Sequence, residues 1–441
     1  MGKSGSWAAI AALAGFLFGF DTAVISGAEQ AVQAVWNMSD ALHGLAISAA
    51  LWGTVIGALA GGWPADRYGR KRTLIWIGVL YAVSAAASAF AQDPYTFMLA
   101  RFIGGLGVGA SSVAAPAYIA EIAPREQRGR LVALFQTMIV TGILVAFFSN
   151  YLLGDSGPDG WRWMLGAELI PAIAYLLATF VIPESPRWLL IEQGRDIDAR
   201  VILTKIDPVR VNEVMAAIHK EAAEEARSLS WGQFFNGHLR RPIMLAFLIA
   251  FFNQLSGINA IIYFAPRIFE LSGAGNSVAL LATVGIGVIN LIFTLGGLML
   301  IDRSGRKFLM YIGSVGYIIS LGMTAYGFAS GQFGLVLPFI LAFIAAHAIG
   351  QGAVIWVYIS EIFPSAARAK GQSLGAGTHW VFAAALTLVM PVVLSSVEPV
   401  TIFLLFAGMM VLQLVWVHVA MVETRGRTLE DISAEMVRKD G

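Results

Sequence analysis

The chain has 441 residues, of which 57% are hydrophobic and only 13% are charged, and its mean hydropathy is +0.72. A soluble chain carries about 25% charged residues, so a water-soluble protein is excluded because too little polar surface would remain to cover the core. A polytopic membrane protein needs no such surface, since lipid covers its apolar faces. The net charge of +1 gives no reason to expect a nucleic-acid partner, and the absence of cysteine from the sequence excludes disulfides and thiolate metal sites.

The N-terminal stretch MGKSGSWAAIAALAGFLFGFDTAVISG has one lysine followed by a long apolar run. A signal peptide is the alternative interpretation. No clear small-residue cleavage site precedes Asp21, and the run is long enough to cross a bilayer. We therefore expect the first spanning helix here.

Charge clusters and Gly or Pro breaks divide the whole chain into twelve apolar windows near the length that spans a bilayer, about 20 residues. The expected spans are 7–28, 42–64, 73–91, 95–119, 129–153, 162–183, 242–270, 276–301, 308–329, 334–359, 369–394 and 400–421. The sequence therefore predicts an all-α polytopic membrane protein with twelve transmembrane helices.

Basic residues are distributed asymmetrically over the connecting loops. Of the 29 Lys and Arg, all but Arg101, Arg162 and Arg267 fall on one side when the N-terminus is taken as cytoplasmic. Positively charged loops favour the cytoplasmic side. We expect both termini in the cytoplasm and the protein in the cell membrane.

The segment 188–241 is charged and differs from the apolar windows around it. The stretches IDARVILTKI and EAAEEAR have helical spacing, and Ile197, Val201, Ile202 and Leu203 recur along one of them. A flexible linker is the alternative interpretation. The periodicity favours short amphipathic helices in the cytoplasm.

Three motifs recur in the same order at nearly the same offset. DRYGRKR (66–72) recurs as DRSGRK (302–307), AEIAPREQRGR (120–130) as SEIFPSAARAK (360–370), and PESPR (183–187) more weakly as VETRG (422–426). The repeat predicts two six-helix halves whose substrate site lies between them near mid-membrane, as in transporters built from parallel repeats. The expected organisation is an N-terminal half 1–187, a cytoplasmic helical linker 188–241, a C-terminal half 242–424 and a cytoplasmic tail 425–441.

These motifs, together with GFLFGFDTAVISG, PESPRWL, QLSGINAIIYFAP and ISEIFPSAARAKGQS, resemble the sugar porter family of the major facilitator superfamily over nearly the whole chain. The resemblance is strongest to bacterial proton-coupled hexose and xylose symporters. It implies the major facilitator fold and a monosaccharide substrate. Composition and spacing alone indicate only the spans, the two halves and a transporter-like plan.

Asp21 is the only acid that we expect at mid-membrane, and Arg101 is the other isolated charge inside a span. A carboxylate there costs about 2.5–3.5 kcal/mol on insertion scales and marks a functional site by default. A purely structural ion pair that braces the N-terminal half is the alternative. The resemblance implies that Asp21 couples proton movement and that Arg101 is its partner.

Amides within spans are the second candidate group. A lone membrane amide is often only a contact between helices, but amides also supply the donors and acceptors that replace water around sugar hydroxyls. The resemblance implies sugar binding by Gln136, Gln254, Asn259 and Asn290. Asn253 departs from the family, because many members carry Gln at this position. The substrate preference of the family is therefore least safely transferred to this chain at Asn253. Gly257 is expected to weaken the helix between Gln254 and Asn259.

Aromatic rings can stack on the CH faces of a pyranose. The resemblance implies that Trp356 and Trp380 line the cavity, and Phe18 and Tyr263 are further wall candidates. His379 stands where relatives carry Asn or Gln, and a neutral imidazole could hydrogen-bond sugar or only pack.

Charged residues at the inner span ends form the third group. The residues are Arg70, Glu121, Arg128, Glu184 and Arg187 in the first half and Arg306, Glu361, Arg368 and Glu423 in the second. Exposed pairs contribute only about 0–1 kcal/mol, and topogenic surface charge is the alternative. The resemblance implies an inner salt-bridge network that holds the outward-open state. Val422 replaces the family's proline before Glu423, which weakens that assignment.

The expected function is import of a monosaccharide such as a hexose or xylose with a proton by alternating access. We expect a monomer, with no cofactor, metal or catalytic residue, and with sugar, proton and lipid as its partners. A proton-independent facilitator is the main alternative, followed by a drug exporter and a sugar sensor. A sensor would need a signalling extension, and only fourteen residues follow Arg427. We expect no nucleotide to be needed, because no GxxxxGK[ST] pattern occurs in the sequence.

Overall fold

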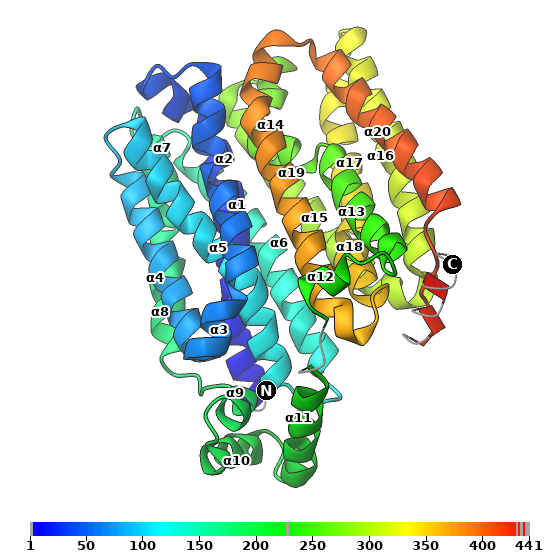
Figure 1. Ribbon diagram of the computed structural model, residues 1–441. Helices are drawn as coiled ribbons and strands as arrows, with labels where there is room; N and C mark the ends of the chain where they lie inside the picture. The colour runs from blue at the N-terminus through cyan, green and yellow to red at the C-terminus, as the bar shows by residue number, and fades with distance from the viewer. Residues whose placement is uncertain (1–2, 226–228, 429–430, 433–434, 437–441) are drawn as a thin grey trace. The chain divides into compact units, whose positions relative to one another are not determined.

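The computed structural model describes residues 3–225, 229–428, 431–432 and 435–436, and the residues it describes are helical with no strand among them (Figure 1). They form two compact units. The first contains residues 1–25, 49–149 and 159–228, and the second contains 26–48, 150–158 and 229–441. Three helices, α1 (Lys3–Val35), α2 (Asp40–Ala60) and α6 (Arg128–Leu153), therefore contribute residues to both units.

The first part of the chain forms five long helices and three shorter ones, α3, α7 and α8, with short connections. They are α1 (Lys3–Val35), α2 (Asp40–Ala60), α3 (Gly62–Tyr68), α4 (Arg70–Ala89), α5 (Pro94–Ile122), α6 (Arg128–Leu153), α7 (Gly160–Ala167) and α8 (Leu169–Thr179). Local sequence explains the start of α5, where Asp93 accepts hydrogen bonds from the backbone N–H groups of Tyr95 and Thr96 and Pro94 occupies the first turn. Hydrogen bonds from the backbone and side chain of Thr96 lower the pKa of the Asp93 carboxyl.

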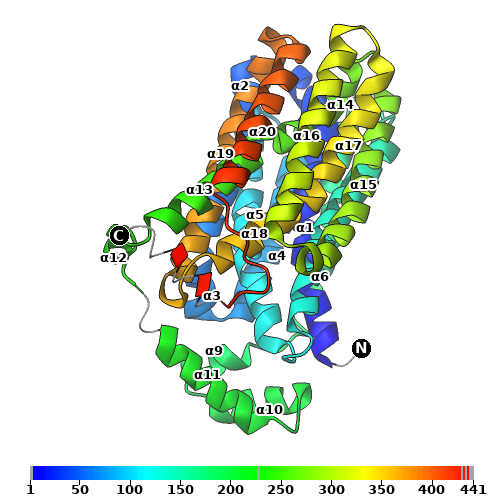
Figure 2. The same ribbon diagram turned by 90° about the vertical axis from the view of Figure 1, so that its right-hand side faces the viewer.

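Short helices follow the first six expected spans, as the charged pattern predicts. They are α9 (Pro186–Ile191), α10 (Asp196–Ile206), α11 (Val211–Glu225) and α12 (Trp231–Phe234). Both views show α9, α10 and α11 gathered together beyond one end of the long helices of the first unit, to which they belong (Figures 1 and 2).

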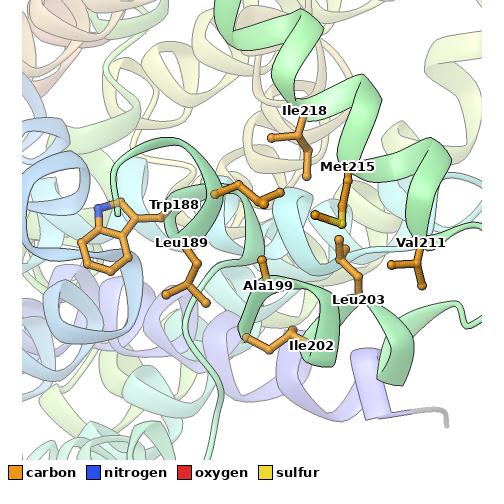
Figure 3. Packing of buried hydrophobic residues seen from close by; sticks show 9 residues of the cluster. Trp188, Leu189, Ala199, Ile202, Leu203, Val211, Met215 and Ile218 are labelled. Atoms are coloured by element: carbon orange, nitrogen blue, oxygen red, sulfur yellow. The ribbon is translucent and has the colours of Figure 1, made fainter. Parts of the chain in front are cut away.

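A small hydrophobic core holds α9, α10 and α11 together (Figure 3). Trp188 and Leu189 from α9 pack with Leu203 from α10 and Met215 from α11. Only part of the apolar pattern along α10 faces this core, because Ile202 and Leu203 are buried whereas Ile197 and Val201 are exposed. Ile197, Val201 and Ile202 stand at positions i, i+4 and i+5, which together cover more than one face of a helix. Only the side chains on the face toward α9 and α11 belong to this core.

The second unit contains the remaining helices. They are α13 (Arg240–Leu255), α14 (Ile258–Leu271), α15 (Asn276–Ser304), α16 (Arg306–Ala329), α17 (Val336–Ile349), α18 (Gln351–Glu361), α19 (Arg368–Ser396) and α20 (Pro399–Val419), with one-turn 3₁₀ helices at Phe333–Leu335 and Ser365–Ala367. Within this unit α16 packs against α17 and α20, and α13 packs against α19.

Eleven helical stretches in the described residues are long and apolar enough to cross a membrane. They agree with eleven of the twelve expected spans. The expected span 162–183 is divided at Glu168 into α7 and α8, of 8 and 11 residues, each shorter than the length that a bilayer requires. Two other spans are also interrupted, between α13 and α14 and between α17 and α18.

Candidate functional site

Asp21 and Arg101 form a buried ion pair between α1 and α5 in the first unit. Both residues are 1% exposed. Arg101 Nη1 donates to Asp21 Oδ1 at 2.6 Å, and Arg101 Nη2 donates to Oδ2 at 3.3 Å and to the Asp21 carbonyl at 3.0 Å. The guanidinium therefore holds both the carboxylate and the backbone of α1 through charge-assisted hydrogen bonds.

Glu168 is a second buried carboxyl beside this pair, and the expectation that Asp21 is the only acid within the spans is wrong. Glu168 lies at the break between α7 and α8 and is 1% exposed. Its side chain interacts with both Asp21 and Arg101 and lies within hydrogen-bond reach of Asp21. Two carboxyls therefore share one guanidinium, and their charges balance when one of them carries a proton. The sequence contains a signal for this residue, because Glu168 is an acid inside an apolar window.

The amides of the second unit meet at the interruption between α13 and α14. Asn259 Nδ2 donates to Gln254 Oε1 at 2.7 Å, and Gln254 Nε2 donates to Asn253 Oδ1 at 2.9 Å. The nitrogen of Gln254 also lies 3.2 Å from both ring nitrogens of His379 on α19. The structure thus brings three expected amides and the histidine into one buried cluster.

Gly257 makes this cluster possible. It has φ +85°, a left-handed backbone conformation, and it separates the last residue of α13 from the first residue of α14. The Ser256 hydroxyl donates to the Asn253 carbonyl at 2.6 Å and accepts from the Ile258 N–H at 3.3 Å. The break is stable in an apolar helix because this side chain satisfies backbone groups that the helix leaves free.

Replacing Gly257 by alanine is expected to lower the melting temperature of the purified protein and the rate of the sugar transport that the sequence predicts. The left-handed conformation costs a residue with a Cβ about 1–2 kcal/mol, and this Cβ would lie 2.6 Å from Cδ2 of Phe406. Gly408→Ala on α20 is the matched control, because its Cβ meets no atom within 4 Å. If Gly257→Ala melts and transports like Gly408→Ala, the break does not require glycine.

Aromatic residues surround His379. The ring centroids of Trp356 and His379 are 5.1 Å apart, and those of His379 and Trp380 are 4.7 Å apart. Trp356 is 39% exposed, whereas Trp380 and Tyr263 are 7% and 1% exposed. Among these three aromatic residues, Trp356 is therefore the one whose ring is accessible to a ligand.

Three further residues expected to contact sugar have other surroundings within their own units. Asn290 on α15 accepts a hydrogen bond from Thr294 at 3.3 Å and is 8% exposed. Gln136 on α6 is half-buried and Phe18 on α1 is buried, and both belong to the first unit. These three assignments remain predictions.

Two of the repeated charges form matching ion pairs, one in each unit. Arg70 pairs with Glu121 at 3.0 Å, and Arg306 pairs with Glu361 at 2.7 Å. Each arginine also donates to a backbone carbonyl five residues earlier, that of Ala65 or Ile301. The same contact therefore fastens the turn before α4 to α5 and the turn before α16 to α18.

The two remaining glutamates of the repeat bind helix starts instead of arginine side chains. Glu184 accepts from the Lys71 N–H at 3.0 Å, and Glu423 accepts from the N–H groups of Arg306 and Lys307, each at 3.0 Å. Both N-termini begin after a left-handed glycine, and a carboxylate is favourable at a helix start. Glu423 thus occupies the counterpart of the Glu184 position although Val422 replaces proline. Burial raises the pKa of the Glu184 carboxyl.

The other three arginines of the expected network take part in neither of these two ion pairs nor in these two helix caps. Arg187 donates to Glu221 on α11 at 2.7 Å, so it connects α9 to α11. Arg128 is exposed and forms no ion pair with the residues that the structure describes. Arg368 has two guanidinium nitrogens without a hydrogen-bond partner in the described part of the chain. Within the units, the residues of the expected network therefore form the ion pairs Arg70–Glu121 and Arg306–Glu361, two helix caps and the separate link from Arg187 to Glu221.

A buried ion pair inside membrane helices and a buried amide cluster at a helix break are features of a transporter for a polar solute. The model of the family described as "Sugar (and other) transporter" matches residues 7–436. The chain belongs to this sugar transporter family.

Relatives and solved structures of the same family cover almost the whole chain. The arabinose-proton symporter of Bacillus subtilis (strain 168) is 37% identical over 434 residues, which cover 96% of this chain and 92% of that protein. The D-xylose-proton symporter of Escherichia coli (strain K12) is 35% identical over 96% of this chain and 94% of its own length. The partially occluded inward-open structure of the E. coli xylose transporter XylE matches with a TM-score of 0.86 and 32% identity, over 96% of this chain and 99% of that one. The major facilitator fold predicted from the sequence is confirmed.

Proposed function

We propose that the protein is a secondary active transporter that imports a monosaccharide with a proton by alternating access. The observation that carries this proposal is the buried Asp21–Arg101 pair, with Asp21 Oδ1 2.6 Å from Arg101 Nη1 and Glu168 beside it. A carboxylate inside the membrane that binds a proton loses its ion pair with the guanidinium, so proton binding and ion pairing are alternatives. The similarity of the chain to an arabinose-proton symporter and a D-xylose-proton symporter supports the same substrate class and coupling ion.

The amide cluster of the second unit is the proposed sugar site. Gln254 and Asn259 now satisfy each other, and a sugar that enters can replace these mutual bonds with bonds to its hydroxyls. Trp356 supplies an exposed ring for the apolar face of the sugar. Asn253 and His379 bond directly to Gln254 and can adjust which hydroxyl geometry is accepted.

We further propose the arrangement expected from the loop charges, with both termini in the cytoplasm and a monomer in the cell membrane. The two six-helix halves are 1–187 and 242–424, with the linker 188–241 and the tail 425–441 on the cytoplasmic side. The ion pairs Arg70–Glu121 and Arg306–Glu361 then lie at the inner face. Their role is to keep the inner ends of each half rigid while the halves move.

Transport of a labelled sugar panel into proteoliposomes, with and without an imposed proton gradient, tests the proposal. We expect one or more pentoses or hexoses to accumulate only when the outside is acidic, and added sugar to make the medium of deenergised vesicles more alkaline. Uptake that equilibrates without concentration, together with an unchanged external pH, would establish the facilitator instead. Failure of every sugar to enter would contradict the substrate class.

A further inference from the structure

A buried tyrosine on α16 contacts both of the interrupted spans of the second unit. Tyr317 is fully buried, and its hydroxyl forms a hydrogen bond with Nδ1 of His347, in the last turn of α17, at 2.6 Å. The same hydroxyl also interacts with the side chain of Ser256, which ends α13. The tyrosine ring lies against Phe343 on α17, with the ring centroids 5.2 Å apart. One residue of α16 therefore contacts the end of α17 and the break that follows α13.

His347 extends this contact across the break between α17 and α18. The break falls at Gly350, whose φ of −82° and ψ of −102° lie outside the helical range. Beyond the break, a Cβ added to Gly352 would lie 3.4 Å from Cδ2 of His347, so the imidazole packs against the first turn of α18. Gly352 and Trp356 are four residues apart and therefore lie on one face of α18. The imidazole thus packs on the helix face that carries Trp356.

Ser256 extends the contact in the other direction, into the amide cluster. Its hydroxyl donates to the carbonyl of Asn253 at 2.6 Å, and the side chain of Asn253 accepts from Gln254 at 2.9 Å. A continuous set of contacts therefore leads from the amides at the first break, through Tyr317 and His347, to α18 after the second break. All of these residues belong to the second unit.

We propose that Tyr317 and His347 are positioning residues, which hold the amide cluster and Trp356 at a fixed separation so that one sugar can contact both. This inference rests on the proposed function, because it takes the amides and Trp356 to be parts of one sugar site. Helices bend most easily where the regular backbone is interrupted, and the two breaks have non-helical backbone at Gly257 and Gly350. Tyr317 lies within the uninterrupted helix α16, so it gives both breaks a common point of attachment.

The loss of this attachment is expected to lower the affinity for sugar, although neither residue needs to touch the sugar. A site that has its binding geometry for only a fraction of the time has a dissociation constant raised by the inverse of that fraction. Tyr317→Phe removes only the hydroxyl, and the loss of one neutral hydrogen bond is expected to weaken sugar binding about 2- to 12-fold.

Equilibrium binding of labelled xylose, arabinose and glucose to the full chain in lipid nanodiscs measures this loss. Tyr311→Phe is the matched control, because Tyr311 lies on the same helix and its hydroxyl bonds to Nδ1 of His418 on α20 at 3.0 Å, in an exposed position. This control should bind sugar like the unsubstituted chain. If Tyr317→Phe binds sugar as tightly as Tyr311→Phe, the positioning role is overturned.

Substitutions of His347 test whether the bond to Tyr317 is responsible. His347→Leu removes the partner of the hydroxyl, whereas His347→Asn keeps a polar side-chain atom near the position of Nδ1. We expect His347→Leu to weaken binding as Tyr317→Phe does, and the double variant to bind no more weakly than either single variant, since both lose the same bond. His347→Asn should restore the affinity. Additive losses in the double variant would contradict the proposal, because the two residues would then act separately.

A Trp356→Ala background distinguishes positioning from a general loss of packing. A sugar that contacts only the amides does not depend on the separation of the two breaks, so Tyr317→Phe should not weaken binding further in this background. An equal loss in both backgrounds would show that Tyr317 only stabilises the fold, and the inference would be wrong. If the unsubstituted chain binds none of the three sugars, the proposed function fails as well. If it binds sugar and the Tyr317 and Tyr311 variants agree, only this inference fails.

Discussion

Replacing Asp21 by asparagine is expected to abolish proton-driven accumulation of sugar while leaving sugar exchange intact. Asparagine has nearly the shape of aspartate, but it cannot exchange a proton for the contact with Arg101 Nη1 that now measures 2.6 Å. With one proton per sugar, a gradient of one pH unit can drive about tenfold accumulation. The expected accumulation ratio of the variant is one, at any imposed gradient.

The measurement compares labelled-sugar accumulation and counterflow in proteoliposomes. Counterflow needs binding and the conformational change but no net proton movement, so it reports whether Asp21→Asn is folded and able to cycle. Asp155→Asn, at an exposed position, is the matched control and should accumulate sugar normally. Sugar concentrated against its gradient by Asp21→Asn would show that another group, with Glu168 the first candidate, couples the proton.

The second large effect is expected from Gln254→Ala, which should weaken sugar binding about 5- to 150-fold. Gln254 is fully buried and bonds to Asn253, Asn259 and His379. Its removal deletes the two amide groups that we propose bind sugar and leaves buried partners unsatisfied, at about 1–3 kcal/mol, which corresponds to that range of dissociation constants.

Equilibrium binding of labelled sugar to the purified protein measures this loss, and the melting temperature shows whether the variant is folded. Gln372→Ala removes an exposed amide from α19, the helix that also carries His379, and should bind sugar like the unsubstituted chain. Unchanged affinity in folded Gln254→Ala would mean that the cluster at the break only joins helices.

Hydropathy and loop charge were sufficient for most of the fold. A spanning helix must be long and apolar whatever its neighbours are, so eleven of the expected spans could be located from composition alone. The turns at Gly69 and Gly305 could be matched through their repeated motifs, and both have positive φ. The meeting of Asp21 with Arg101 could be expected because unpaired charges are so costly within the membrane.

The remaining features depend on which faces of the helices meet, and spacing does not determine this. Glu168 stands inside an expected span, but spacing alone does not place its carboxyl beside Asp21. Tyr317 and His347 are 30 positions apart on different helices, and only packing brings the hydroxyl of one to 2.6 Å from Nδ1 of the other. The caps made by Glu184 and Glu423 were expected as salt bridges, because sequence does not distinguish an arginine side chain from a helix N-terminus as the partner of a carboxylate.

The division of one span into α7 and α8 at Glu168 affects how the topology of the chain is counted. Helix length alone finds eleven crossings in the described residues, and an odd number would put the two chain ends on opposite faces of the bilayer. Counting α7 and α8 together as one crossing makes the number even and returns both ends to the same face. Counting the span that is broken at Glu168 as one crossing therefore assigns every loop after Gly160 to the face opposite the one that a count by helix length alone would give.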